Sequence, residues 1–172
     1  YKMLRQGGFI VDDNVDEIQM YIEKARKIEN DETCKHLIIN PTINCNFNCW
    51  YCYEKHIPSE MTVETINNIK KLIEKSCKQS KELMISFFGG EPFLCYKRVM
   101  LPILTYAKKI AQENNVRFVS NCTTNGSLIN IERIKELKSL NFNFAQITLD
   151  GNREVHNQTR RFANGKGTYD II

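Results

Sequence analysis

The chain has 172 residues, 42% hydrophobic and 26% charged, which is typical of a globular protein with one core. Its net charge of +4 comes from Lys and Arg scattered among acidic residues, so no basic run favours nucleic-acid binding. We expect no membrane span and no secretory leader, and therefore a cytoplasmic protein. In a reducing compartment, the seven cysteines favour metal binding over disulfides.

Residues 1–33 are predicted to be an N-terminal extension that contains a short strand and an amphipathic helix. Gly7-Gly8 indicates a turn, and the apolar run Phe9-Ile10-Val11 that follows is typical of a brief strand. Apolar residues then recur at helical spacing from Val15 to Ile28. The chain starts without Met and stops where a further helix is expected, so we interpret it as a piece of a longer protein.

Residues 34–172 are predicted to form one domain in which strands and helices alternate. The strands are short apolar runs, predicted at residues 37–39, 83–88, 116–123 and 143–149. Apolar residues at helical spacing predict three helices. The first begins at Val63 with Thr62 as its N-cap, and the third begins at Ile131 with Asn130 as its N-cap. The second begins near Pro102 and ends at residues 114–115.

Four strand and helix units in series predict a parallel α/β sheet with right-handed crossovers. Each polar or glycine-rich motif follows directly after one of the four strands; the motifs are Cys45 to Cys52, Gly89 to Pro92, Thr124 to Gly126 and Thr148 to Gly151. Because the carboxyl ends of parallel strands meet at one edge, where ligands bind, we expect these motifs to converge.

Three cysteines, Cys45, Cys49 and Cys52, lie on one short loop at intervals of four and three residues. Three thiolates can hold three irons of a cubane cluster, which ordinarily takes four cysteines, and they leave one iron open to a substrate or cofactor. The alternative is a structural zinc site completed by Cys34, His56 or Cys77. Zinc spacings more often come as two Cys pairs, and no second pair is present, so iron and sulfur are favoured.

The cysteine spacing resembles the signature of the radical S-adenosylmethionine (SAM, here AdoMet) enzymes. The motif Gly89-Gly90-Glu91-Pro92 at the end of the second strand is similar to the GGEP motif of that family. The resemblance covers the chain from about Leu37 onward, and it implies a partial (β/α) barrel, here truncated after about four units. It also implies a [4Fe-4S] cluster on the three cysteines whose open iron is chelated by AdoMet.

The resemblance implies roles for further residues. The Gly89 to Pro92 motif would meet the AdoMet amino group, with acceptors from backbone carbonyls and the Glu91 region. Tyr51 matches an aromatic position near the adenine, and Asn125 is a candidate ligand of the ribose, although turn geometry explains Asn125-Gly126 equally well. Trp50 and Tyr51 are expected to shield the sulfurs, and Phe47 is expected to pack beneath the loop.

The stretch from Thr148 to Tyr169 resembles the SPASM-type branch, which includes sulfatase-maturing enzymes and peptide maturases. Thr148 stands where that branch usually has Ser, and Arg160 is a candidate partner of the AdoMet carboxylate, ahead of Arg161. Asp150 and His156 are candidates for proton transfer. Structural roles, as a turn cap for Asp150 and a hydrogen-bonded interior residue for His156, are equally compatible.

The resemblance implies an enzyme that cleaves AdoMet reductively and uses the 5′-deoxyadenosyl radical to modify a peptide or protein. Alternatives are a sulfatase-maturing enzyme that forms formylglycine, and a non-catalytic zinc- or AdoMet-binding fragment. The expected partners are the peptide or protein substrate and an electron donor such as flavodoxin or ferredoxin. We also expect self-association, because a sheet that ends after four strands leaves an unpaired edge.

Overall fold

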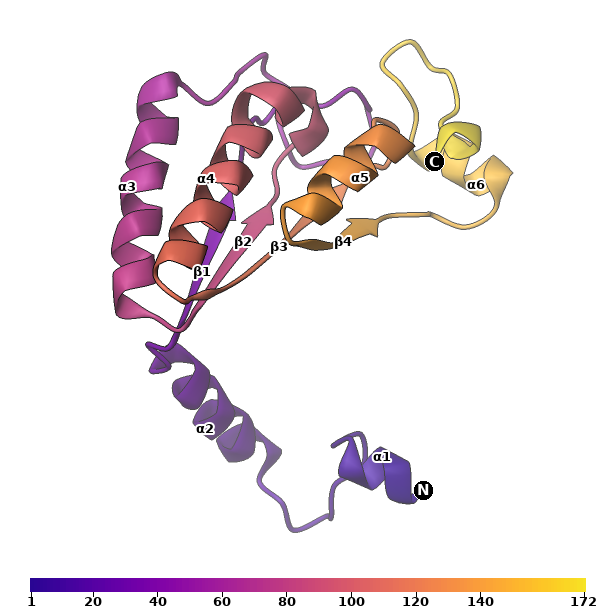
Figure 1. Ribbon diagram of the computed structural model, residues 1–172. Helices are drawn as coiled ribbons and strands as arrows, with labels where there is room; N and C mark the ends of the chain where they lie inside the picture. The colour runs from indigo at the N-terminus through magenta and orange to yellow at the C-terminus, as the bar shows by residue number, and fades with distance from the viewer. The chain divides into compact units, whose positions relative to one another are not determined.

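The computed structural model describes residues 1–172, which divide into two compact units, residues 1–32 and 33–172. The first unit contains helices α1 (Lys2–Gln6) and α2 (Glu17–Glu29) (Figure 1). Helix α2 begins after Asp16, whose side chain accepts a hydrogen bond from the Gln19 N–H at 2.9 Å. Side chains on α2 such as Ile18 and Tyr21 are exposed, so the predicted amphipathic helix is present with an uncovered apolar face.

The strand predicted at residues 9–11 is wrong. Gly7 and Gly8 instead terminate α1: Gly8 has a φ of +73°, and the Phe9 N–H returns to the Leu4 carbonyl at 2.9 Å. A strand needs a neighbour to satisfy its backbone groups, and the first unit contains no other strand. The apolar run therefore stays irregular, and the Phe9 side chain is exposed.

The second unit is built on a four-stranded parallel sheet in the order β1-β2-β3-β4, as predicted. Its strands are β1 (Cys34–Ile39), β2 (Glu82–Phe87), β3 (Arg117–Thr124) and β4 (Phe142–Ile147). The helices between them are α3 (Val63–Gln79), α4 (Leu101–Glu113) and α5 (Ile131–Ser139), and Figure 1 shows all three on one face of the sheet. The predicted caps are confirmed, because Thr62 accepts from the Thr65 N–H and Asn130 from the Arg133 N–H.

Short helical segments follow two of the strands, β2 and β4. Strand β2 leads into a 3-10 helix, η1 (Pro92–Cys95), and then into one π-helical turn, η2 (Tyr96–Met100), which runs directly into α4. After β4 the chain forms α6 (Arg153–Thr159) and a final 3-10 turn, η3 (Tyr169–Ile171).

The core lies between the sheet and its three helices. Alternate residues of β2, namely Leu83, Ile85 and Phe87, are almost fully buried and pack with Ile73 of α3 and Ile103 of α4. The strand register continues this layer, since Ile85 pairs with Leu37 on one side and with Ser120 on the other. The sheet and helices are thereby fixed by one continuous apolar layer.

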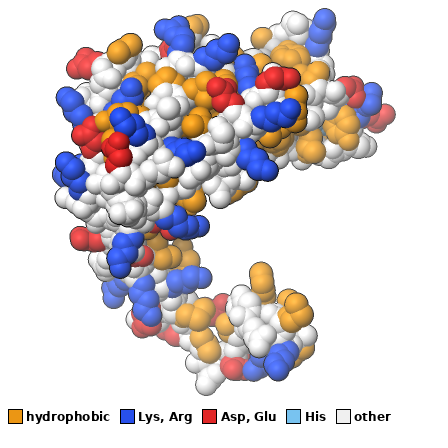
Figure 2. All heavy atoms as spheres, in the orientation of Figure 1, with side chains coloured by type: hydrophobic (Ala, Val, Ile, Leu, Met, Phe, Trp, Pro, Cys, Tyr) orange, Lys and Arg blue, Asp and Glu red, His pale blue; other side chains and the backbone are white.

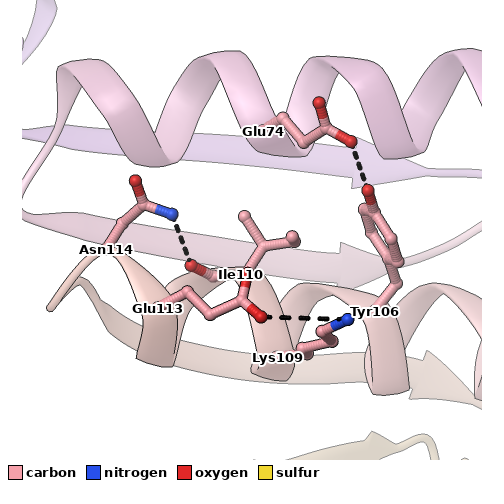
Figure 3. Close-up of polar contacts among 6 residues, drawn as sticks. All are labelled: Glu74, Tyr106, Lys109, Ile110, Glu113 and Asn114. Carbon is pink, nitrogen blue, oxygen red and sulfur yellow. Dashed lines mark hydrogen bonds and ion pairs between the residues drawn. The ribbon is translucent and has the colours of Figure 1, made fainter.

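Polar contacts join α3 and α4 outside that layer. The Tyr106 hydroxyl of α4 donates a hydrogen bond to the Glu74 carboxylate of α3 (Figure 3). On α4 itself, Lys109 and Glu113 form an ion pair at 3.8 Å, and the Asn114 side chain donates to the Ile110 carbonyl at 2.8 Å (Figure 3). Only the half-buried Tyr106–Glu74 bond joins the two helices, whereas the exposed ion pair within α4 contributes little to the free energy of unfolding compared with the core.

The opposite face of the sheet has no helix packed on it. Ile38 of β1 is 67% exposed and Phe144 of β4 is 58% exposed, although both lie in apolar runs. The prediction that residues 37–39 form a buried strand is therefore right only for alternate residues. Side chains of a strand alternate between faces, and here only one face is covered.

The charge distribution on the surface is mixed. Figure 2 shows Lys and Arg side chains interspersed with Asp and Glu over the visible face. None of the helices combines the length and the apolar character that a bilayer crossing requires.

Candidate functional site

A cavity of about 250 Å³ lies where the loops after all four strands meet. It contains many of the residues predicted for the site, which are Cys45, Cys49, Tyr51, Cys52, Gly89, Gly90, Asn125, Thr148 and Arg160. The predicted residues Glu91, Pro92, Asp150 and His156 do not line this cavity. The parallel sheet thus brings segments far apart in sequence to one edge, as the strand order predicts.

The cysteine loop is irregular, and the segment that follows α6 holds it from one side. The Asn48 N–H donates to the Arg161 carbonyl at 2.6 Å, and the Trp50 N–H donates to the Thr159 carbonyl at 3.3 Å. Phe47 is buried beneath the loop, as expected, and its ring lies edge-on to Phe162 at 5.2 Å between centroids. The cysteine loop and the segment at the end of α6 therefore support each other, although more than one hundred residues of sequence separate them.

The three thiols of the loop differ in their surroundings. Cys45 and Cys49 are half-buried, whereas Cys52 is exposed. Burial raises the pKa of Cys45 and of Cys49, and the Arg160 guanidinium partly offsets this increase at Cys49. Because metal ligation requires thiolates, loading this loop releases protons. Trp50 is 72% exposed and does not line the cavity that the three thiols share, so shielding of the sulfurs by its ring stays a prediction.

The loop does not assemble a site for a single metal ion. No three His, Cys, Asp or Glu side chains converge on a point where one ion could be held. His56 lies near the loop, with Nε2 at 3.4 Å from the Cys52 Sγ, but Cys34 starts β1 at the other end of the sheet and Cys77 is buried on α3. A tetrahedral zinc ion needs four converging ligands, whereas cubane ligands bind separate irons. Of the proposed fourth zinc ligands, only His56 lies beside the loop, so the structure removes Cys34 and Cys77 from that alternative.

Gly89 and Gly90 are required by the packing of the backbone. A Cβ on Gly90 would lie 2.1 Å from the Asn44 carbonyl oxygen, and one on Gly89 would lie 2.6 Å from that of Thr42. Gly89 also has a φ of +107°, which other residues rarely adopt. The Glu91 N–H donates to the Asn44 carbonyl at 2.9 Å. The motif therefore does more than turn the chain, because it supports the segment that leads into the cysteine loop.

The Glu91 carboxylate points into the protein and joins two loops. It is fully buried and accepts hydrogen bonds from the Phe93 N–H, the Thr124 hydroxyl and the Asn125 N–H, at 3.0, 2.8 and 2.8 Å. Burial raises its pKa, and the three donors act in the opposite direction. Pro92 is buried at the start of η1. Acceptors for a ligand amino group in this region are thus left to backbone carbonyls.

Arg160, Tyr51 and Asp150 form a chain of hydrogen bonds at the edge of the cavity. The Arg160 Nη1 donates to the Tyr51 hydroxyl at 2.7 Å, and that hydroxyl donates to the Asp150 carboxylate at 2.6 Å. The Arg160 Nε is buried and has no hydrogen-bond partner. Arg161 is exposed and does not line the cavity. Arg160, and not its neighbour, therefore lines the cavity and carries a buried donor that no group of the chain satisfies.

His156 is an interior residue with both ring nitrogens engaged. Its Nδ1 accepts from the Asp150 N–H at 3.2 Å, so the proton of the neutral ring lies on Nε2. Nε2 is 3.1 Å from the Thr168 Oγ1, which itself donates to the Arg160 carbonyl at 2.6 Å. The His156 side chain thereby fixes the backbone on both sides of α6, which agrees with the structural interpretation.

The residues present fit the two predicted cofactors. Three thiols of one loop face a shared cavity, backbone without side chains borders it at Gly89 and Gly90, and a buried guanidinium nitrogen lacks a partner. Thr148 also lines the cavity, and its hydroxyl makes no hydrogen bond within the chain. Sulfur ligands suit iron, and an unpaired Arg nitrogen suits a carboxylate.

Comparison with known proteins assigns the family. A family model described as the Radical SAM superfamily matches residues 39–172, which is more than half of the chain. The chain belongs to the radical SAM superfamily. This superfamily uses a [4Fe-4S] cluster and AdoMet, which are the cofactors predicted from the sequence.

Similar proteins have different names within this superfamily. The radical SAM cyclopropyl synthase TigE of Paramaledivibacter caminithermalis is 34% identical, over 78% of this chain and 32% of its own length. The cysteine-type anaerobic sulfatase-maturating enzyme of Clostridium novyi is 28% identical, over 79% of this chain and 38% of its own. The chain therefore spans about a third of the length of these relatives.

A solved structure shows the same fold. Native anSMEcpe with bound AdoMet and Cp18Cys peptide superposes with a TM-score of 0.68 at 25% identity, covering 79% of this chain and 37% of that one. The open four-stranded sheet agrees with the predicted partial barrel.

Sequence reasoning missed several parts of the site. Helix α6 was not predicted, although Asn152 is a good N-cap and Glu154 lies in the first turn. The hydrogen bonds of Thr168, Asn46 and Ser127 were also missed. Side chains whose partners are distant in sequence leave no local pattern from which to predict such contacts.

The lowered pKa of the buried His156 predicts how the free energy of unfolding depends on pH. Burial and the Arg160 charge lower its pKa below the ordinary 6.5, so below that pH the unfolded chain binds more protons than the folded protein. The free energy of unfolding should therefore fall as the pH drops below about 6.5, by at most roughly 1.4 kcal/mol per pH unit from this group. Urea unfolding at several pH values measures this slope.

The variant His156→Gln keeps a donor and an acceptor but does not titrate, so it should show a smaller slope than the wild type. His36→Gln changes an exposed histidine and serves as the control. Equal slopes for the wild type and His156→Gln would contradict the prediction.

Proposed function

We propose that this protein is a radical SAM enzyme that modifies a peptide or protein. The observation that carries the proposal is that three loop cysteines, the Gly89-Gly90 backbone and Arg160 line one cavity, and that the Arg160 Nε is buried without a hydrogen-bond partner. The cofactors, when bound, supply an electron and the 5′-deoxyadenosyl radical that abstracts a substrate hydrogen. The protein's part is to hold, orient and protect them.

The chain's residues divide these tasks. Cys45, Cys49 and Cys52 ligate iron, and Arg160 binds the AdoMet carboxylate through a guanidinium that Tyr51 already orients. Gly89 and Gly90 leave the backbone accessible to the amino group of AdoMet. The Thr148 hydroxyl is free to bind the same ligand. Tyr51 stays protonated, because burial and its bond to Asp150 raise its pKa. We assign to its ring the position near the adenine that the family resemblance implies.

Asp150 and His156 are better explained as positioning groups than as proton carriers. His156 is buried with both nitrogens engaged, and Asp150 accepts from Tyr51. Neither lines the cavity in which the ligand would lie. We assign to them the support of Tyr51 and Arg160.

The proposed substrate is a peptide or protein. One similar curated protein is named as a cyclopropyl synthase and another as a sulfatase-maturating enzyme, and anSMEcpe was solved with a peptide. The main proposal is maturation of a ribosomally made peptide, and formylglycine formation is the alternative. We also propose flavodoxin or ferredoxin as the electron donor, and we propose a reducing, cytoplasmic location, with which seven cysteines outside any disulfide agree.

The gene neighbourhood distinguishes the two substrates. We expect a gene for a short precursor peptide beside this one, and a mass change in that peptide when it is incubated with AdoMet and the reconstituted enzyme. A neighbouring sulfatase gene, together with oxidation of a sulfatase-derived Cys peptide and no change in the precursor, would support the alternative instead.

The cluster assignment predicts the effect of Cys49→Ala. After anaerobic reconstitution with iron and sulfide, the wild type should turn brown, bleach with dithionite and convert AdoMet to 5′-deoxyadenosine. Cys49→Ala removes one of three ligands and should abolish that product, measured by liquid chromatography. The control Cys77→Ala removes a buried thiol on α3 and should retain it. A wild type that holds one tight zinc and no sulfide would overturn the proposed function.

We further propose that the β4 edge mediates self-association. Strand β4 ends the sheet order, and an apolar hollow of about 370 Å³ beside it includes Phe144 and Ile147. Unpaired strand edges with apolar side chains recruit further strands. Light scattering should show a dimer that Phe144→Lys returns to monomer, while Ile38→Lys on the opposite edge strand leaves it dimeric. A monomeric, folded wild type would contradict this proposal.

A further inference from the structure

Three side chains beside Cys45 form a closed ring of hydrogen bonds. The Asn125 Nδ2 donates to the Asn46 Oδ1 at 2.8 Å, and the Asn46 Nδ2 donates to the Ser127 Oγ at 2.9 Å. The Ser127 hydroxyl closes the ring by donating to the Asn125 Oδ1 at 2.7 Å. The ring joins the cysteine loop to the loop after β3, and two of its members were not among the predicted site residues.

The direction of the ring is fixed by one backbone group. The Ser127 N–H donates to the Asn125 Oδ1 at 3.0 Å, and a backbone N–H can only donate. Oδ1 of Asn125 must therefore face Ser127, so its Nδ2 faces Asn46. The Asn46 oxygen must then receive that donor, which leaves its Nδ2 for the Ser127 hydroxyl. Each side chain has one orientation that satisfies all the bonds.

The ring also delivers a donor to a cysteine. The Asn125 Nδ2 lies 3.7 Å from the Cys45 Sγ, so its amide is shared between Asn46 and this sulfur. The Phe47 N–H is a second donor to the same sulfur, at 3.4 Å. Cys45 is thus the loop cysteine whose sulfur receives N–H donors from both its own loop and the loop after β3.

The backbone of Asn125 is fixed by a hydrogen bond to a buried carboxylate. Its backbone N–H donates to the buried Glu91 carboxylate at 2.8 Å, and only 5% of the residue is exposed. The neighbouring Thr124 hydroxyl donates to the same carboxylate. The ring is therefore anchored, through the Asn125 backbone, to the fully buried carboxylate of Glu91.

We propose that Asn46, Asn125 and Ser127 act as one positioning unit that fixes Cys45 and, through the Asn125 amide, tunes the reduction potential of the cluster bound there. This inference rests on the proposed function for its cluster. It gives the Asn125 amide a role other than binding ribose, because both its oxygen and its nitrogen are already engaged. An N–H donor stabilises negative charge on sulfur, which grows on reduction, so its loss makes the potential more negative.

The first test uses the protein without cluster. Alkylation of each cysteine with iodoacetamide is followed by peptide mass spectrometry. Each rate is taken from the high-pH plateau of its own pH profile, so that it reports access of the reagent to the sulfur and not the thiolate fraction. Because the ring holds Cys45 in place, Ser127→Ala and Asn46→Ala should each raise this plateau rate at Cys45 by at least about fivefold, the factor that a net hydrogen bond of about 1 kcal/mol corresponds to. Cys49 and Cys52 should change little. Asn48→Ala alters an exposed Asn of the same loop and is the matched control.

Cooperativity distinguishes a ring from independent contacts. If the three side chains act as a unit, the double variant Asn46→Ala with Ser127→Ala should raise the rate at Cys45 by less than the product of the single effects. An unchanged rate at Cys45, equal increases at all three cysteines, or multiplicative single effects would overturn the proposal.

The second test uses the reconstituted protein. The midpoint potential, followed by electron paramagnetic resonance, should become more negative in Asn125→Ala and shift in the same direction, by less, in Ser127→Ala. Asn48→Ala should match the wild type. A cluster that forms with unchanged potentials in both ring variants overturns this inference and leaves the proposed function intact. If the ring protects Cys45 from alkylation but the protein binds no cluster, the proposed function fails, and only the positioning of Cys45 by the ring is supported.

Discussion

The buried carboxylate of Glu91 is the interaction on which the site depends. A carboxylate without water is strongly unfavourable unless it is hydrogen-bonded, and Glu91 receives donors from η1, from Thr124 and from the Asn125 backbone. These donors are in place only when the loops after β2 and β3 close on each other. Once closed, the two loops support the start of the cysteine loop, through the Glu91 N–H to Asn44 and through the Asn125 side chain to Asn46.

The cysteine loop has no regular secondary structure, so it depends on its neighbours for a defined conformation. The loops after β2 and β3 support one side of it. The segment after α6 supports the other, through backbone hydrogen bonds from Asn48 and Trp50 and through Phe47 against Phe162. His156 and Thr168 in turn hold that segment, and Arg160 lies within it. The positions of the three cysteines are thereby set by a network of partners outside their own loop, which is also the usual arrangement at metal sites.

The cavity lies in the part of the chain that the superfamily model matches. A cyclopropyl synthase and a sulfatase-maturating enzyme each match more than three quarters of this chain, although the two names denote different products. The three loop cysteines and Arg160 all fall within residues 39–172, which the superfamily model matches. The face of the sheet without helices lies outside this cavity and leaves Ile38 and Phe144 exposed.

The sequence by itself determined the strand order, the helix caps and the family, because these depend on local spacing: three cysteines on one loop, glycines after a strand, and apolar residues at regular intervals. It failed at residues 9–11, since a strand exists only with a partner. It also did not predict the burial of Glu91, the engagement of both His156 nitrogens, or the ring of Asn46, Asn125 and Ser127. Only the tertiary structure decided these features, because each consists of hydrogen bonds between segments that the parallel sheet brings together. Whether a polar side chain faces a ligand or the protein interior depends on partners that are remote in the chain.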